Sequence, residues 1–242
     1  MAITKVESGL ADSILEDLSL NYQVTVVKDW GEATGEGVDE VWRGGDWSMN
    51  ELQIVRQGVS DLASAMGGAQ AFINNMGDTV ISQEAIKYRG LASSRGVKFT
   101  NSPISIDQWT VVHELAHVWD AQVNWRLSKA LEDYTGGYTS LIAMLLKRWR
   151  TGFDEEQRQP GANRFGYFYG DIPPAGSDQN FNRKEDFAES VTAYVYPALV
   201  QSRVERFKDD ERYRSFLYYP DYTKTKRWAF VNGLVKGTII VK

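Results

Sequence analysis

The chain contains two histidines, and they stand four residues apart with a glutamate directly after the first. Residues 113–117 read His-Glu-Leu-Ala-His, which is an HExxH motif. On a helix, residues four apart project from one face, so both imidazoles can bind one metal ion while the glutamate reaches a water on that metal. The motif therefore predicts a zinc site in which His113 and His117 are ligands and Glu114 is the general base.

A helix over the motif is favoured by its flanks. Ser105 and Asp107 are N-cap residue types, and Gln108 follows Ser105 by three residues, as in a capping box. Apolar residues recur at helical spacing, at Val112, Leu115, Ala116 and Trp119. The helix would end at Gly136 and Gly137 at the latest. The alternative is a pair of partly buried histidines that is satisfied by hydrogen bonds and holds no metal.

A catalytic zinc site needs a third protein ligand and one open position. The extended motif HExxHxxGxxH is excluded, because Asp120 stands at the glycine position and Val123 at the third histidine position. With no further histidine and no cysteine, a carboxylate must serve. Glu185 is the best candidate, and the lesser candidates are Asp186, Glu189, Glu155 and Glu156.

Glu185 and Glu189 lie four residues apart in a segment, residues 184–200, whose apolar residues have helical spacing. Both glutamates would share one face, so Glu185 could bind zinc while Glu189 accepts the ring N–H of a ligating histidine. The alternative is a solvated acidic face, which is common on surface helices.

These two segments together resemble the gluzincin metallopeptidases, and in particular the group that contains the catalytic domain of anthrax lethal factor and the Pro-Pro endopeptidases. There, HExxH is followed by a helix with a sequence similar to Glu-Asp-Phe-Ala-Glu, residues 185–189 here. The resemblance implies a two-lobed zincin fold, with Glu185 as ligand and Glu189 behind it. It also implies a tyrosine before the ligand that stabilises the oxyanion, for which Tyr169 is the candidate.

Composition narrows the class of protein. The 242 residues carry a net charge of −5 from interspersed acids and bases without a basic tract, which argues against nucleic acid and anionic membranes as partners. No apolar run approaches membrane-spanning length. The absence of cysteine excludes disulfides and thiolate ligands. We expect a monomer whose partner is a peptide or protein substrate.

Localisation is left open by the N-terminus. Residues 1–7 lack the apolar core of a signal peptide. The chain is therefore intracellular, exported by another route or cut from a longer precursor, and the family resemblance leans toward a secreted protein.

The order of predicted elements indicates an α+β fold in one domain over residues 1–242. An N-terminal lobe of helices and a small sheet, with the motif helix, extends to about residue 133, and a helical lobe begins at about residue 134. The predicted strands are residues 23–27, 79–82, 86–91 and 97–100. The other predicted helices are residues 9–20, 48–66, 140–149, 184–200, 209–217 and 224–235.

Two segments are predicted to be loops. Residues 31–37 are rich in glycine but lack the spacing of a phosphate-binding loop. Residues 151–182 hold five glycines, three prolines and the aromatic cluster at residues 165–169, and a loop of that length in a compact domain is usually functional. We expect it to face the substrate.

The function that follows is hydrolysis of internal peptide bonds by a water that zinc activates and Glu114 deprotonates. The strand at residues 97–100, or a neighbouring strand, would offer backbone groups to an extended substrate. Two alternatives remain: a non-enzymatic zinc-binding interaction module, and a peptidase used as a toxin or effector domain with a single protein target.

Overall fold

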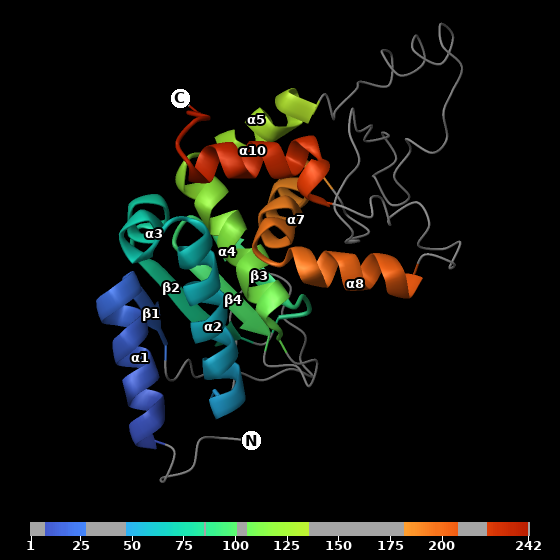
Figure 1. The fold of residues 1–242 in the computed structure, drawn as a ribbon. Coiled ribbons are helices and arrows are strands. Elements are labelled where there is room, and N and C mark those ends of the chain that lie inside the picture. The colour runs from blue at the N-terminus through green and yellow to red at the C-terminus, as the bar shows by residue number, and fades with distance from the viewer. Residues whose placement is uncertain are drawn as a thin grey trace, which may run out of the picture. The chain divides into compact units, whose positions relative to one another are not determined.

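The computed structural model describes residues 8–27, 47–84, 86–100, 106–135, 182–207 and 222–241 (Figure 1). The chain divides into two compact units, Met1–Gln122 and Val123–Lys242. The described residues are mostly helical and include one four-stranded mixed sheet. The predicted α+β class is therefore confirmed.

The first unit opens with helix α1 (Ser8–Tyr22), strand β1 (Val24–Val26) and helix α2 (Met49–Ala65). It continues through helix α3 (Ala69–Met76), strands β2 (Thr79–Glu84), β3 (Gly90–Ser93) and β4 (Gly96–Thr100), and helix α4 (Gln108–Gln122), which carries the HExxH motif. These elements surround one apolar core, to which the helices and the central strands all contribute buried side chains.

The sheet has the order β1-β2-β4-β3. β1 pairs with β2 and β2 with β4 in parallel, whereas β3 runs antiparallel to β4, with Leu91 opposite Lys98. A parallel pair needs a crossover connection, and α2 and α3 lie on the one between β1 and β2. β4 is thus hydrogen-bonded on both sides, while β3 has one strand partner among the described residues.

α2 begins with the capping box that the sequence predicts. The Ser48 hydroxyl accepts a hydrogen bond from the backbone N–H of Glu51, and the Glu51 carboxylate accepts one from the backbone N–H of Ser48 at 2.8 Å. This reciprocal pair satisfies backbone donors that the first turn of a helix otherwise leaves without partners.

The second unit is helical in its described part. It comprises α5 (Arg126–Thr135), α7 (Arg183–Val195), α8 (Pro197–Phe207), the short 3-10 helix η2 (Tyr222–Lys224) and α10 (Lys226–Val235). α7 packs against both α5 and α10. Phe187, Val191 and Phe230 are almost fully buried and form part of its core.

The structure differs from the sequence predictions in three places. α3 was not predicted at all, and the strand predicted at residues 86–91 begins only at Gly90. The single helix predicted at residues 184–200 is two helices, because Pro197 has no backbone N–H and disfavours helical geometry at the residue before it. Tyr196 accordingly leaves the helix, with φ −121° and ψ 57°.

Other predicted segments fall outside the described residues. They are the loops at residues 31–37 and 151–181, including Tyr169, and the helices at residues 140–149 and 209–217. The remaining predicted helices and strands are found at nearly the expected positions.

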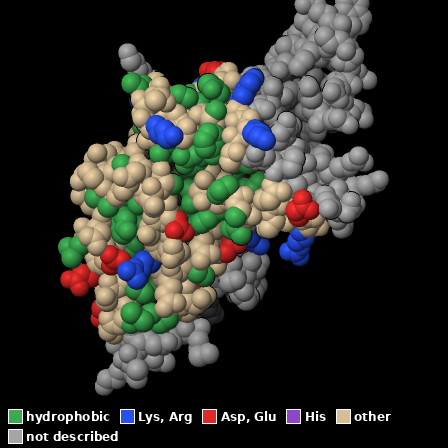
Figure 2. All heavy atoms as spheres, viewed as in Figure 1, with side chains coloured by type: hydrophobic (Ala, Val, Ile, Leu, Met, Phe, Trp, Pro, Cys, Tyr) green, Lys and Arg blue, Asp and Glu red, His purple; other side chains and the backbone are tan. Residues whose placement is uncertain are grey.

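None of the described helices is both long and apolar enough to cross a membrane. On the face drawn in Figure 2, acidic and basic side chains of the described residues are interspersed, as the sequence indicates.

Candidate metal centre

Helix α4 positions the HExxH motif, and it begins with a side-chain cap. The Asp107 carboxylate accepts hydrogen bonds from the backbone N–H and the hydroxyl of Thr110, both at 2.7 Å. This cap was one of the two that the sequence suggested; the other, Ser105, lies outside the described residues. Nearly every residue of α4 is buried, so the helix runs through the interior of the protein and does not lie on its surface.

Two contacts in the first unit fix where α4 lies. Gly58 on α2 packs against Val111 so closely that a Cβ on Gly58 would come within 2.6 Å of Val111 Cγ1. At the far end of α4, the Gln122 amide donates to the backbone carbonyls of Met76 at 2.9 Å and Ser94 at 2.7 Å. The motif is therefore held by close packing near its start and by hydrogen bonds at its end.

The two histidines of the motif face each other. Their Nε2 atoms are 3.2 Å apart, and their rings meet edge to face at an interplanar angle of 84°. Two nitrogens bound at about 2.05 Å to a tetrahedral zinc ion would lie about 3.3 Å apart, so the spacing fits a shared ion. The same distance also suits an N–H···N hydrogen bond between the rings, which is the metal-free alternative.

Glu114 lies beside the start of β3. The residue is 8% exposed. An ideal Cβ on Gly90 would lie 2.5 Å from Glu114 Cγ and 2.6 Å from its Cδ and Oε1, so any other residue at position 90 would displace the Glu114 side chain from this position. The candidate general base therefore rests directly on the backbone of the strand that has one partner among the described strands.

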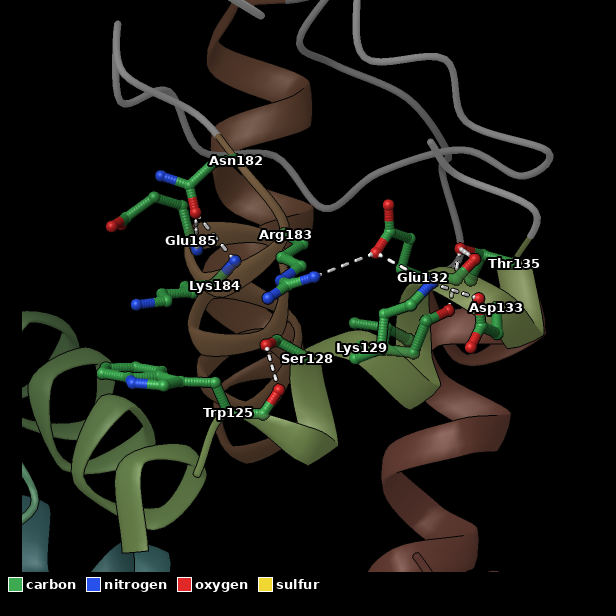
Figure 3. Close-up of polar contacts among 11 residues, drawn as sticks. Trp125, Ser128, Lys129, Glu132, Asp133, Thr135, Asn182, Arg183, Lys184 and Glu185 are labelled. Atoms are coloured by element: carbon green, nitrogen blue, oxygen red, sulfur yellow. Dashed lines mark hydrogen bonds and ion pairs between the residues drawn. The ribbon is translucent and has the colours of Figure 1, made fainter. Parts of the chain in front are cut away.

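Glu185 belongs to the first turn of α7, which Asn182 caps. The Asn182 side-chain oxygen accepts hydrogen bonds from the backbone N–H groups of Lys184 at 2.8 Å and Glu185 at 3.4 Å. Figure 3 shows the Glu185 side chain pointing away from the neighbouring pair of Arg183 and Glu132.

His113, His117 and Glu185 form a group that could hold a metal ion. Each offers one ligand atom, and these atoms lie within 4.8 Å of one another. Two imidazoles and one carboxylate are a known donor set of catalytic zinc, and three protein ligands leave a fourth position open. The residues present thus fit the metal that the sequence predicts.

The lesser ligand candidates differ in what they can do. Asp186 is 1% exposed, and its two carboxylate oxygens accept hydrogen bonds from Arg227 at 2.7 and 3.1 Å, so it is committed to that pair. Burial raises the pKa of the Asp186 carboxyl, and the Arg227 guanidinium opposes that rise. Glu189 is buried on α7 at 7% exposure. Glu155 and Glu156 lie outside the described residues, as does Tyr169.

Two residues near the centre were missed from the sequence. Gly90 falls within the strand predicted at residues 86–91, although a glycine in a strand can mark a close backbone approach. Arg227 falls within the helix predicted at residues 224–235. No sequence signal shows that it is fully buried, because arginine is usually exposed.

The chain was compared with known proteins and structures. No family model matches the chain, and no curated protein or solved structure shows significant similarity to it.

Proposed function

We propose that this protein is a zinc-dependent metallopeptidase that hydrolyses internal peptide bonds. The observation that carries the proposal is the group of ligand atoms from His113, His117 and Glu185, which lie within 4.8 Å of one another, together with Glu114 on the helix that holds both histidines. A purely structural site has no use for the glutamate beside the first histidine, whereas hydrolysis needs a base there.

The proposal includes a zincin-like fold. It is supported by the order of helix, small sheet and motif helix in the first unit, followed by a helix that carries an acidic residue in its first turn. It is also supported by the packing of α4 against β3.

His113, His117 and Glu185 would hold the ion, which when bound would acidify a water molecule and polarise the scissile carbonyl. Glu114 takes the proton from the attacking water and passes it to the leaving amine. Its burial at 8% exposure favours this role, because a base screened from bulk water interacts more strongly with the reacting groups. Tyr169 remains the candidate that donates a hydrogen bond to the oxyanion.

β3, not β4, is the strand that we propose to align the substrate. β4 has strand partners on both sides, which removes the expectation for residues 97–100. β3 lies at the edge of the described sheet and touches Glu114 through Gly90. An extended peptide that pairs with β3 would bring its backbone to the base, and it would be cleaved within the chain.

The decisive experiment assays the purified, zinc-loaded protein on a peptide library and identifies the cut sites by mass spectrometry. We expect internal cuts with the wild type and with Glu16→Gln, a control at an exposed acid. Glu114→Gln should retain zinc but lose nearly all turnover. A zinc-loaded Glu114→Gln variant that still cleaves would refute the assignment of the base, and products trimmed from one terminus would refute endopeptidase action.

A further inference from the structure

The side chains that flank Glu185 are both tethered. On one side, Lys184 Nζ lies 3.4 Å from the centroid of the Trp125 ring; Figure 3 shows the two side chains next to each other. On the other side, Asp186 receives two hydrogen bonds from Arg227 of α10, Nε to Oδ1 at 2.7 Å and Nη2 to Oδ2 at 3.1 Å. Successive residues of a helix point about 100° apart. Fixing the directions in which residues 184 and 186 leave the helix therefore also fixes the direction in which the Glu185 side chain leaves it.

The Arg227–Asp186 pair is the stronger of the two tethers. Arg227 is 0% exposed and Asp186 1%, so neither charge is screened by water. The planar guanidinium binds both carboxylate oxygens, which sets the orientation of the two groups as well as their distance. The Ser190 hydroxyl, 3.5 Å from Asp186 Oδ1, adds a further contact on α7 itself.

Stability alone does not account for such a pair. Removing two charges from water costs several kcal/mol per ion, and apolar residues of similar volume often stabilise a core equally well or better. An apolar pair, however, would not fix the rotation of α7 about its axis, whereas a two-bonded ion pair does. The best-attested use of a buried polar or ionic group is to select one register of packing over the alternatives.

We propose that Arg227 is a positioning residue for metal binding: through Asp186 it holds the first turn of α7 so that the Glu185 carboxylate keeps the direction it needs as a ligand. This inference rests on the proposed function, because it takes Glu185 to be a zinc ligand. It assigns to α10, far along the chain from the HExxH motif, a part in setting metal affinity.

The test compares zinc affinity with stability in the full chain. The double variant Asp186→Leu/Arg227→Met replaces the pair by apolar residues. The single variant Arg227→Lys keeps the positive charge but loses the planar guanidinium that binds both carboxylate oxygens. Arg183→Ala is the matched control. Arg183 lies in the same turn, but its side chain is half-exposed and its ion pair with Glu132 is long, at 3.8 Å. Zinc affinity is measured by competition with a chelator well below the melting temperature of each metal-free variant, and Co²⁺ absorption spectra report the ligand geometry.

We expect the double variant to fold without metal and to bind zinc roughly 10 to 100-fold more weakly, as is usual when a group that orients a ligand is lost. Its Co²⁺ spectrum should change, and that of Arg183→Ala should not. Arg227→Lys should also lose affinity, and it decides the question if the double variant fails to fold.

A folded double variant, or a folded Arg227→Lys, with wild-type affinity and spectrum would overturn the inference alone. A wild type that binds no zinc would overturn the proposed function and this inference with it.

Discussion

Two of the candidate ligand carboxylates on α7, those of Glu185 and Glu189, stand one turn apart but have different environments. Glu185 lies in the first turn, where Asn182 binds its backbone N–H, and it belongs to the group that could hold a metal. Glu189 is buried at 7% exposure. The two should therefore respond differently to the same substitution.

We expect Glu185→Ala to abolish zinc retention or weaken it severely, because it removes one of three ligands. Glu189→Ala should leave a site weakened by roughly 10 to 100-fold, the usual loss when a group behind a ligand is removed. Elemental analysis after dialysis and chelator competition measure both. If Glu185→Ala held zinc as the wild type does, the third ligand would be misassigned.

The contact between Gly90 and Glu114 yields a prediction about stability, which does not depend on metal, and a second one about turnover, which does. Gly90→Ala places a Cβ within 2.6 Å of three side-chain atoms of Glu114, so it should displace that carboxylate. We expect lower stability in urea, and a loss in kcat on the order of 100-fold with zinc retained, as small misplacements of a catalytic group cause.

Glu114→Ala should relieve the crowding. In a double-mutant cycle, Gly90→Ala should therefore cost less stability when Glu114 is already alanine. Strictly additive stabilities would show that the two residues do not press on each other.

At the scale of the elements, the position of the motif helix depends on the close approach of α2 and α4. Gly58 permits that approach at Val111. Such a dependence is testable, because the chain also has a helical glycine, Gly9 on α1, with nothing within 4 Å of its missing Cβ.

Gly→Ala raises helix propensity at both positions, and by more in the interior of α2 than in the first turn of α1, so a Gly58→Ala variant that is the less stable of the two reveals the packing. We expect Gly58→Ala to be less stable than Gly9→Ala by about 1 to 3 kcal/mol, the usual cost of overpacking. Urea unfolding measures both, and Val111→Ala in the Gly58→Ala background should recover part of the loss. Equal stabilities of the two glycine variants would contradict the close packing.

The helices with strong local signals could be predicted from the sequence. α2 has its capping box at Ser48, and the motif helix has Asp107 at its N-cap, so a short stretch of chain specifies each start. α3 could not be predicted, because it has eight residues and no side-chain cap. The end of α4 could not be predicted either, since left-handed Asn124 and Trp125, with φ +57° and +61°, follow it without a glycine.

The candidate site was predictable as far as chemistry restricts the choice. With two histidines and no cysteine, elimination restricts the third candidate ligand to a carboxylate, and the spacing of Glu185 and Glu189 on one helical face favours Glu185, which belongs to the group that could hold a metal. The residues that hold the ligands were not predictable, because they depend on tertiary contacts. Gly90 acts through a contact between a strand and a helix, and Arg227 lies 41 residues from Asp186.

For the whole molecule, the proposal requires one zinc ion per chain. A ligand that binds only the folded state raises stability in proportion to the logarithm of its free concentration over Kd, so a hundredfold excess over Kd adds about 2.7 kcal/mol. We expect the melting temperature to fall when a chelator removes zinc and to return when zinc is restored. Glu185→Ala should melt at one temperature with and without the chelator.

The approach of Gly90 to Glu114 also constrains how the sequence can diverge. Every other amino acid has a Cβ, so any replacement at position 90 has to displace the Glu114 side chain. In a mutational scan, position 90 should tolerate substitutions poorly, whereas Gly9 should tolerate many. Once Glu114 is lost, the constraint disappears. Related sequences that lack the glutamate should therefore also be free to vary at position 90.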